Sequence, residues 1–181
     1  MGTGKHSEDN YRLSPELSDL LLELSKPGNR PLPLGVDQAD GLFVPAGGGF
    51  SYLVANPPFG GREGDQRRET AFLLHALDQL APGGTCACIV PNGLLSRTSD
   101  LDLRQSLVEE YWLSRIVMLP LHCFQPAASV RASILIVTKV PAPEHLPIQL
   151  SDLRSADPGQ RLDELLPSGR FPPLVDRKSV V

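Results

Sequence analysis

The tetrapeptide Asn56-Pro57-Pro58-Phe59 carries the residues of this chain that are best suited to chemistry. It follows the apolar run 52–55, which is typical of a strand, and two successive prolines end a strand abruptly because proline fixes φ and lacks a backbone donor. The tetrapeptide is therefore predicted to lie beyond the carboxyl end of that strand, where open α/β sheets bind their ligands. At that place the Asn56 amide oxygen and the Pro57 carbonyl would be acceptors, and Phe59 would offer an aromatic face.

These groups suit methyl transfer to the exocyclic amine of a planar base. Such an amine is a weak nucleophile because its lone pair is delocalised into the ring. Two acceptors that take both N–H protons would favour a pyramidal nitrogen, which is electrostatic preorganisation. A base inside a duplex cannot reach such a pocket, so DNA would be bound with the target nucleotide flipped out and stacked on Phe59. The alternative is that Asn-Pro-Pro is only a rigid turn after a strand.

Three arginines follow this turn closely and admit two interpretations. Arg62, Arg67 and Arg68 are near enough in sequence to contact phosphates beside a flipped base. They would equally suit the solvated start of a helix, since charged side chains are usually exposed.

The composition is that of one soluble domain. The chain has 181 residues, of which 41% are hydrophobic and 21% charged, and this supports a single core. No apolar run approaches a membrane span and no secretory leader is recognised, so no membrane partner is expected. Cys86 and Cys88 would alternate on one strand without good disulfide geometry, which predicts buried thiols in the cytoplasm and no metal site. With a net charge of −4, much of the DNA affinity is expected from a partner.

Short apolar strands alternate with amphipathic helices in the middle of the chain, and this predicts an α/β fold of the doubly wound class. Helices are expected over residues 67–80 and 100–111, the second with Ser99 as its cap and Asp102 completing a capping box. An earlier helix is expected over residues 14–26, with a stripe formed by Leu17, Leu20, Leu21 and Leu24. The expected strands are residues 53–55, 86–90, 116–119 and 132–140, as neighbours in one sheet.

Further segments after the tetrapeptide carry a more specific signal. In order they are Phe72-Leu73, Leu80-Ala81-Pro82-Gly83-Gly84, Ile89-Val90-Pro91-Asn92-Gly93, Arg104-Gln105-Ser106-Leu107, Ile116-Val117-Met118-Leu119-Pro120 and Ser133-Ile134-Leu135-Ile136-Val137-Thr138-Lys139. Together with Leu53 to Gly60, this series resembles the N6-adenine DNA methyltransferases that serve as modification subunits of type I restriction-modification systems. The resemblance covers residues 50–139.

The resemblance implies a partial Rossmann-like sheet of the S-adenosylmethionine-dependent methyltransferases, with flanking helices and a terminal antiparallel strand pair. It places catalytic roles on Asn56, Pro57, Pro58 and Phe59, and methylation at adenine N6 in DNA. The implied partners are DNA and the specificity and restriction subunits of a restriction-modification complex.

The implied cofactor is S-adenosylmethionine, yet its glycine-rich loop is not recognisable in residues 1–49. Asp40-Gly41-Leu42-Phe43 resembles the acidic segment before the catalytic strand, which would place Asp40 near the cofactor adenine. Three alternatives stay open: Gly2-Thr3-Gly4 as the tail of the loop, the same residues as a frayed terminus, and deletion of the loop. The isolated chain is therefore expected to bind the cofactor weakly or not at all.

Two alternative functions stay open beside DNA adenine methylation. Methylation of a protein glutamine or an RNA guanine would use the same tetrapeptide. A non-catalytic remnant acting as a binding or assembly module is a different class of function.

Four segments are expected along the chain. Residues 1–49 form an N-terminal helix and connector, residues 50–140 the catalytic region that receives the target base, and residues 141–175 a proline-rich extension with a helical stretch near 159–166. Residues 176–181 match the translation of a common sequencing adaptor and are predicted to be an artefact, so the chain is expected to be truncated.

Overall fold

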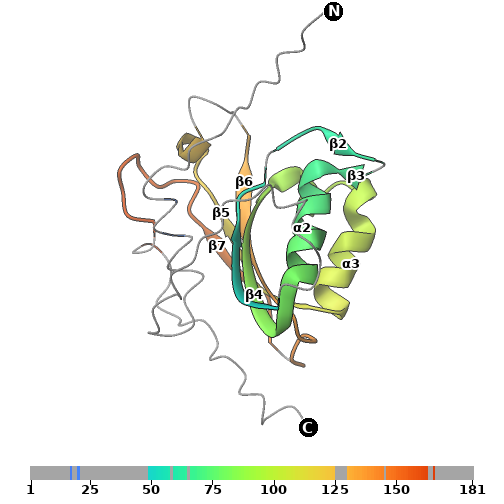
Figure 1. Ribbon diagram of the computed structural model, residues 1–181. Helices are drawn as coiled ribbons and strands as arrows, with labels where there is room; N and C mark the ends of the chain where they lie inside the picture. The colour runs from blue at the N-terminus through green and yellow to red at the C-terminus, as the bar shows by residue number, and fades with distance from the viewer. Residues whose placement is uncertain are drawn as a thin grey trace, which may run out of the picture.

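The protein is seen in a computed structural model that describes residues 17, 20, 49–57, 59–64, 66–124, 130–144, 146–162 and 165. Within these residues a five-stranded sheet has the order β1-β4-β6-β5-β7. Its strands are β1 (Phe50–Ala55), β4 (Leu80–Pro91), β5 (Trp112–Met118), β6 (Ala132–Thr138) and β7 (Gln149–Asp152). A short hairpin, β2 (Arg62–Glu63) with β3 (Gln66–Arg67), stands beside it. In Figure 1 this hairpin lies at the end of the sheet where α2 begins.

The sheet mixes parallel and antiparallel pairs. β1 runs parallel to β4, β6 runs antiparallel to both β4 and β5, and β7 runs parallel to β5. The four expected strands are thus confirmed as parts of one sheet, with the terminal antiparallel pair formed by β5 and β6. The carboxyl ends of β1, β4, β5 and β7 share one edge with the start of β6.

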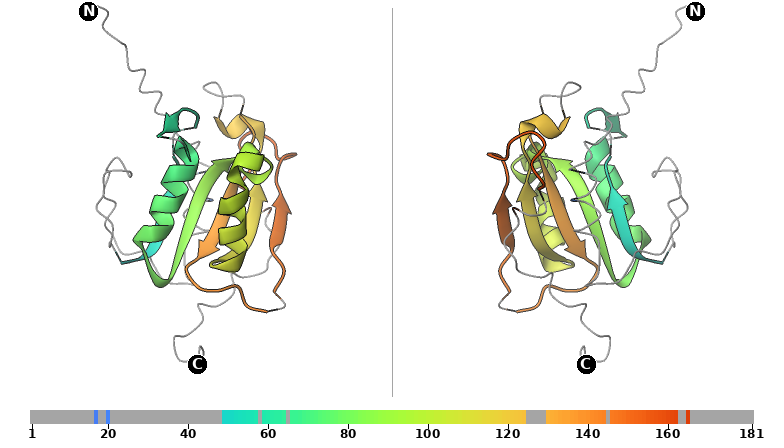
Figure 2. Two further views of the ribbon diagram at one scale, coloured as in Figure 1. Left: turned by 90° about the vertical axis from the view of Figure 1, so that its right-hand side faces the viewer. Right: turned by 90° about the vertical axis from the view of Figure 1, so that its left-hand side faces the viewer.

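Helices α2 (Arg68–Gln79) and α3 (Leu101–Glu109) lie side by side on one face of the sheet (Figure 2). Both were expected, since their apolar residues recur at helical spacing. The stripe of α2 buries Leu73, Ala76 and Leu77, and that of α3 buries Leu103 and Leu107. Within the described part of the chain, three short 3-10 turns join the main elements: η2 (Asn92–Leu95), η3 (Thr98–Asp100) and η4 (Leu121–Phe124).

β4 is an interior strand, between β1 and β6, and is covered on both faces. Cys86, Cys88 and Val90 pack in the core beneath α2 and α3, whereas Ala87 and Ile89 face the opposite core. Two leucines of the expected N-terminal helix, Leu17 and Leu20, are helical and fully buried in that opposite core. Leu21 and Leu24 lie outside the described residues. Both faces of β4 are therefore covered, as its continuous apolar run predicts.

Three local expectations were wrong or incomplete. Ser99 does not cap α3: Asp100 holds the cap position and makes no side-chain cap hydrogen bond, because its carboxylate is engaged elsewhere. The helical stretch expected from residue 159 does not start there, since residues 159–162 form turns and irregular backbone. The strand β7 was not expected within the proline-rich extension. Residues 176–181 lie outside the described residues.

Among the described residues, no helix is long and apolar enough to cross a membrane.

Candidate active site

The tetrapeptide lies where β1 ends. Ala55 is the last residue of β1 and pairs with Cys88 of β4, and Asn56 follows it with an exposed side chain. β4 continues past Cys88 to Pro91, so Asn56 lies beside the last residues of β4 at the carboxyl edge of the sheet. Pro57 is buried, and its ring fixes φ where the chain leaves the strand. An exposed amide therefore stands on an anchored turn.

Phe59 is half-buried and contacts a second aromatic ring. Its ring centroid lies 5.8 Å from that of Phe124, with the planes inclined at 55°. Phe124 ends η4, which follows β5, and it is buried in the core on the face opposite α2 and α3. The pair thus brings together the carboxyl ends of β1 and β5, two strands that are not neighbours in the sheet.

Two glycines let the chain turn away after Phe59. Gly60 and Gly61 both have φ of 82°, in the left-handed region that side chains disfavour. The β2–β3 hairpin follows, in which Arg62 pairs with Arg67, and the Arg68 N–H donates to the Gly61 carbonyl at 3.5 Å. This hydrogen bond closes the hairpin loop, so α2 begins directly where the loop returns to Gly61.

The three arginines of this loop differ in their surroundings. Arg62 and Arg67 are exposed on the hairpin. Arg68 is half-buried, and its Nε atom is buried without a hydrogen-bond partner. Two of the three therefore have the exposure that a phosphate contact requires.

The loop after β4 is fixed by two hydrogen bonds to the start of β6. The Asn92 N–H donates to the Arg131 carbonyl at 2.8 Å, and Ser133 Oγ donates to the Asn92 side-chain oxygen, also at 2.8 Å. Because Ser133 is fully buried, the Asn92 amide is held in one orientation at the carboxyl edge.

An ion-pair network ties this loop to the first turn of α2. Arg97 donates through Nε to Asp100 at 2.6 Å and through Nη2 to Glu69 at 3.0 Å. Both carboxylates are buried, with side-chain exposures of 2% for Glu69 and 3% for Asp100. Burial lowers the pKa of Arg97, but the hydrogen bonds to Asp100 and Glu69 outweigh it and the pKa is raised overall. The guanidinium is therefore fully charged.

The N-6 DNA methylase family model matches residues 36–164 of this chain. The chain belongs to the N-6 DNA methylase family. It is 34% identical, over 124 residues, to the methylase subunit of the type I restriction enzyme EcoEI from Escherichia coli, covering 61% of this chain and 23% of that subunit. The chain thus spans about a quarter of the length of this relative.

Two methyltransferase structures are among the solved structures that resemble the chain. The M protein of the type I restriction enzyme EcoKI aligns with a TM-score of 0.51 at 25% identity, over 70% of this chain and 30% of that one. A protein from Listeria monocytogenes assigned to the class I S-adenosylmethionine-dependent methyltransferases aligns with a TM-score of 0.53 at 22% identity, over 66% of this chain and 42% of that one. The fold is thus the Rossmann-like fold of these methyltransferases, as expected.

Two members of the predicted site, Asp40 and Pro58, lie outside the described residues. In the described part, the glycines after β1 lead into a hairpin, and Gly93 lies inside the 3-10 turn η2 that directly follows β4. Neither of these loops leads from a strand end directly into an α-helix, which is the arrangement that holds the phosphates or ribose of a nucleotide cofactor. Among the described residues, these two loops therefore do not form a cradle of that type.

Sequence reasoning missed Phe124 and Arg97. Phe124 carried a usable signal: it is the aromatic residue that closely follows strand 116–119, which must end at the same edge as residues 53–55 if the strands are parallel. Arg97 carried no signal for its contact with Glu69, which lies 28 residues away in the sequence; only Asp100 is a local partner, at i+3.

Proposed function

We propose that this chain forms the target-base half of an S-adenosylmethionine-dependent methyltransferase that acts on adenine N6 in DNA. The observation that carries the proposal is the exposed Asn56 amide at the carboxyl end of β1, followed at once by Phe59 against Phe124. An amide acceptor and an aromatic wall are the two features that a flipped adenine needs.

The roles of these residues follow from their chemistry. The Asn56 side-chain oxygen and the Pro57 carbonyl accept the N6–H protons of the base, which localises the lone pair on nitrogen. Phe59 stacks on the base, with Phe124 supporting the Phe59 ring from behind. Arg62 and Arg67 contact the phosphates beside the extruded nucleotide. The cofactor would supply an electrophilic methyl group when bound, and the resemblance assigns Asp40, which lies outside the described residues, to the cofactor adenine.

The proposed setting is a restriction-modification methylase in the cytoplasm. Its partners are DNA and the specificity and restriction subunits, which agrees with the chain's likeness to a type I methylase subunit. Because the chain spans about a quarter of that subunit, the remaining parts are expected to hold the cofactor and most of the DNA.

The test places this segment in a protein that supplies the missing parts. Residues 36–164 replace the corresponding stretch of the EcoEI methylase subunit, and the chimera is expressed in a host without adenine methylation. Mass spectrometry of nucleosides then measures N6-methyladenine in DNA, with the Asn56→Ala chimera as the matched control. Methyladenine is expected with Asn56 and not with Ala.

Two other results would count against the proposal. A soluble chimera that binds S-adenosylmethionine but methylates no adenine would contradict it. Methyl groups found on protein glutamine or on RNA guanine would favour the alternative substrates. For the isolated chain, calorimetry is expected to show cofactor binding weaker than micromolar.

A further inference from the structure

Two loops leave the carboxyl edge of the sheet next to the candidate site, one after β1 and one after β4. The first holds Asn56 and Phe59 and runs through the β2–β3 hairpin into α2, and the second runs through η2 and η3 into α3. The backbone pairing of β1 with β4 ends at Ala55 and Cys88, before either loop begins. Another interaction must therefore fix how the two loops lie relative to each other.

Arg97 supplies that interaction. Its guanidinium contacts Glu69 in the first turn of α2 and Asp100 in η3, at 3.0 and 2.6 Å. The second oxygen of Asp100 accepts a hydrogen bond from Thr70 Oγ1 at 3.0 Å, so Asp100 is also tied to α2. Two residues of α2 are thus joined to two residues of the other loop.

The Arg97 side chain is itself held in place. Gly93 leaves room for it, because a Cβ at that position would lie 3.2 Å from an Arg97 Nη atom. The Arg97 N–H donates to the Gly93 carbonyl at 2.8 Å, and Arg104 of α3 donates to the carbonyls of Leu94 and Arg97. The guanidinium is therefore presented to Glu69 from a rigid support.

We propose that Arg97 is a positioning residue: by bridging Glu69 and Asp100 it fixes the catalytic turn against the loop after β4, and so sets the geometry in which the target base is received. This inference rests on the proposed function. Arg97 is too far along its loop to be assigned a contact with the base, and it acts through the first turn of α2. Lysine cannot replace it, since one ammonium does not span two carboxylates in a fork.

The first test uses the intact 181-residue chain and needs no activity. Hydrogen exchange of the amides from residues 60–70 is compared between the unmodified chain, Arg97→Lys and Glu69→Gln. Loss of a charge-assisted bond is expected to speed exchange in this loop roughly tenfold, while amides of β5 and β6 are unchanged. Unchanged exchange in both variants would overturn the proposal.

The second test measures kinetics in the methylase chimera. Arg97→Lys and Glu69→Gln are expected to lower kcat/KM for DNA roughly tenfold, because the base is received in a less well-defined site, while KM for S-adenosylmethionine stays within about twofold. Faster loop exchange with unaltered DNA kinetics would show a purely structural role and overturn the proposal. An equal loss of affinity for both substrates would do the same.

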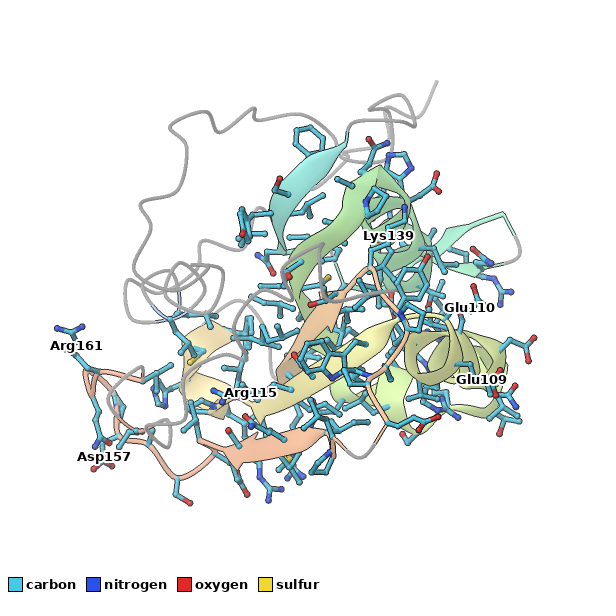
Figure 3. All side chains as sticks on the ribbon, turned by 90° about the horizontal axis from the view of Figure 1, so that it is seen from below. Glu109, Glu110, Arg115, Lys139, Asp157 and Arg161 are labelled. Atoms are coloured by element: carbon cyan, nitrogen blue, oxygen red, sulfur yellow. The ribbon has the colours of Figure 1, made fainter. Side chains whose placement is uncertain are left out.

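Arg115→Lys is the matched control. Arg115 is more fully buried than Arg97, but it lies on β5 and donates to Gln149 of β7, away from both loops. Figure 3 shows it across the sheet from Glu109, the last residue of α3, and Glu110, which follows the helix. This variant is expected to lower stability without changing the loop exchange or the DNA kinetics. An inactive unmodified chimera would be a failure of the proposed function, whereas an active chimera that tolerates the Arg97 and Glu69 variants would be a failure of this inference alone.

Discussion

Thr70 and Asp100 lie 30 residues apart in the sequence, yet Thr70 Oγ1 donates to a buried carboxylate oxygen of Asp100 at 3.0 Å. The bond explains why Asp100 stands at the start of α3 without capping it. Its two oxygens are used by Thr70 and Arg97, so none is turned toward the amides of the α3 first turn. A residue in a local capping position thus serves a contact between helices.

The first prediction follows from this diversion. Asp100→Ala should lower the free energy of unfolding by about 2 kcal/mol or more, because buried Thr70 and partly buried Arg97 both lose a partner. Ser99→Ala should change it by less than about 0.5 kcal/mol, since Ser99 caps nothing. Urea unfolding of both variants measures the difference. A loss of stability above this limit for Ser99→Ala would show that Ser99 caps α3.

The second prediction concerns the close approach of β1 to β4. A Cβ on Gly84 would lie 2.6 Å from the Phe50 carbonyl oxygen and 2.9 Å from that of Ala81, and both are backbone atoms that cannot rotate away. Gly84→Ala should therefore cost about 1–3 kcal/mol through overpacking, measured by thermal or urea unfolding. Stability equal to that of the unmodified chain would mean that this end of β1 is free to shift.

The third prediction tests the base acceptor. In the methylase chimera, Asn56→Ala should reduce turnover on the order of a hundredfold or more, which is typical when one preorganised hydrogen bond is lost. Cofactor affinity should change far less. Methyl incorporation into adenine-containing duplexes measures turnover. Duplexes that contain cytosine but no adenine serve as the blank. If Asn56→Ala methylates at the unmodified rate, the tetrapeptide is only a structural turn.

The fourth prediction separates stacking from hydrogen bonding. Phe59→Ala should weaken capture of the base by roughly 1–3 kcal/mol, and Phe59→Tyr or Phe59→Trp should keep substantial activity because an aromatic face remains. The readout is KM for DNA beside kcat in the same assay. Activity that survives Phe59→Ala but fails in Phe59→Tyr would argue for a packing role against Phe124.

The fifth prediction concerns pH and the carboxyl end of β7. Hydrogen bonds from the Arg154 side chain, and then from its backbone N–H, lower the pKa of Asp152 to about 2. A carboxylate with a lowered pKa adds stability above its unfolded pKa of about 3.9, and this contribution is lost as the pH falls through about 2. A carboxyl NMR titration should give a midpoint near that value, and Arg154→Ala should raise it. An ordinary midpoint in the unmodified chain would show that the pair does not form in solution.

Local pattern was sufficient for much of this fold. Two prolines after an apolar run locate the end of β1, and helical spacing of Leu73 and Leu77 gives α2, because both signals depend on neighbours in the chain. The same applies to the family, since the order of short segments around Asn56 is a property of the sequence. The roles of Asn56, Phe59 and Asp40 remain predictions.

Only the tertiary structure brought together residues that the chain keeps apart. Phe124 meets Phe59, and Arg97 meets Glu69, because the ends of β1, β4 and β5 share one edge; this depends on strand order, which periodicity does not encode. β7 was missed for a related reason. Gln149–Asp152 form a strand only because β5 offers an edge to pair with. Sequence determined which segments form elements, and packing decided which side chains meet, since contacts between distant residues depend on the faces that the whole fold buries.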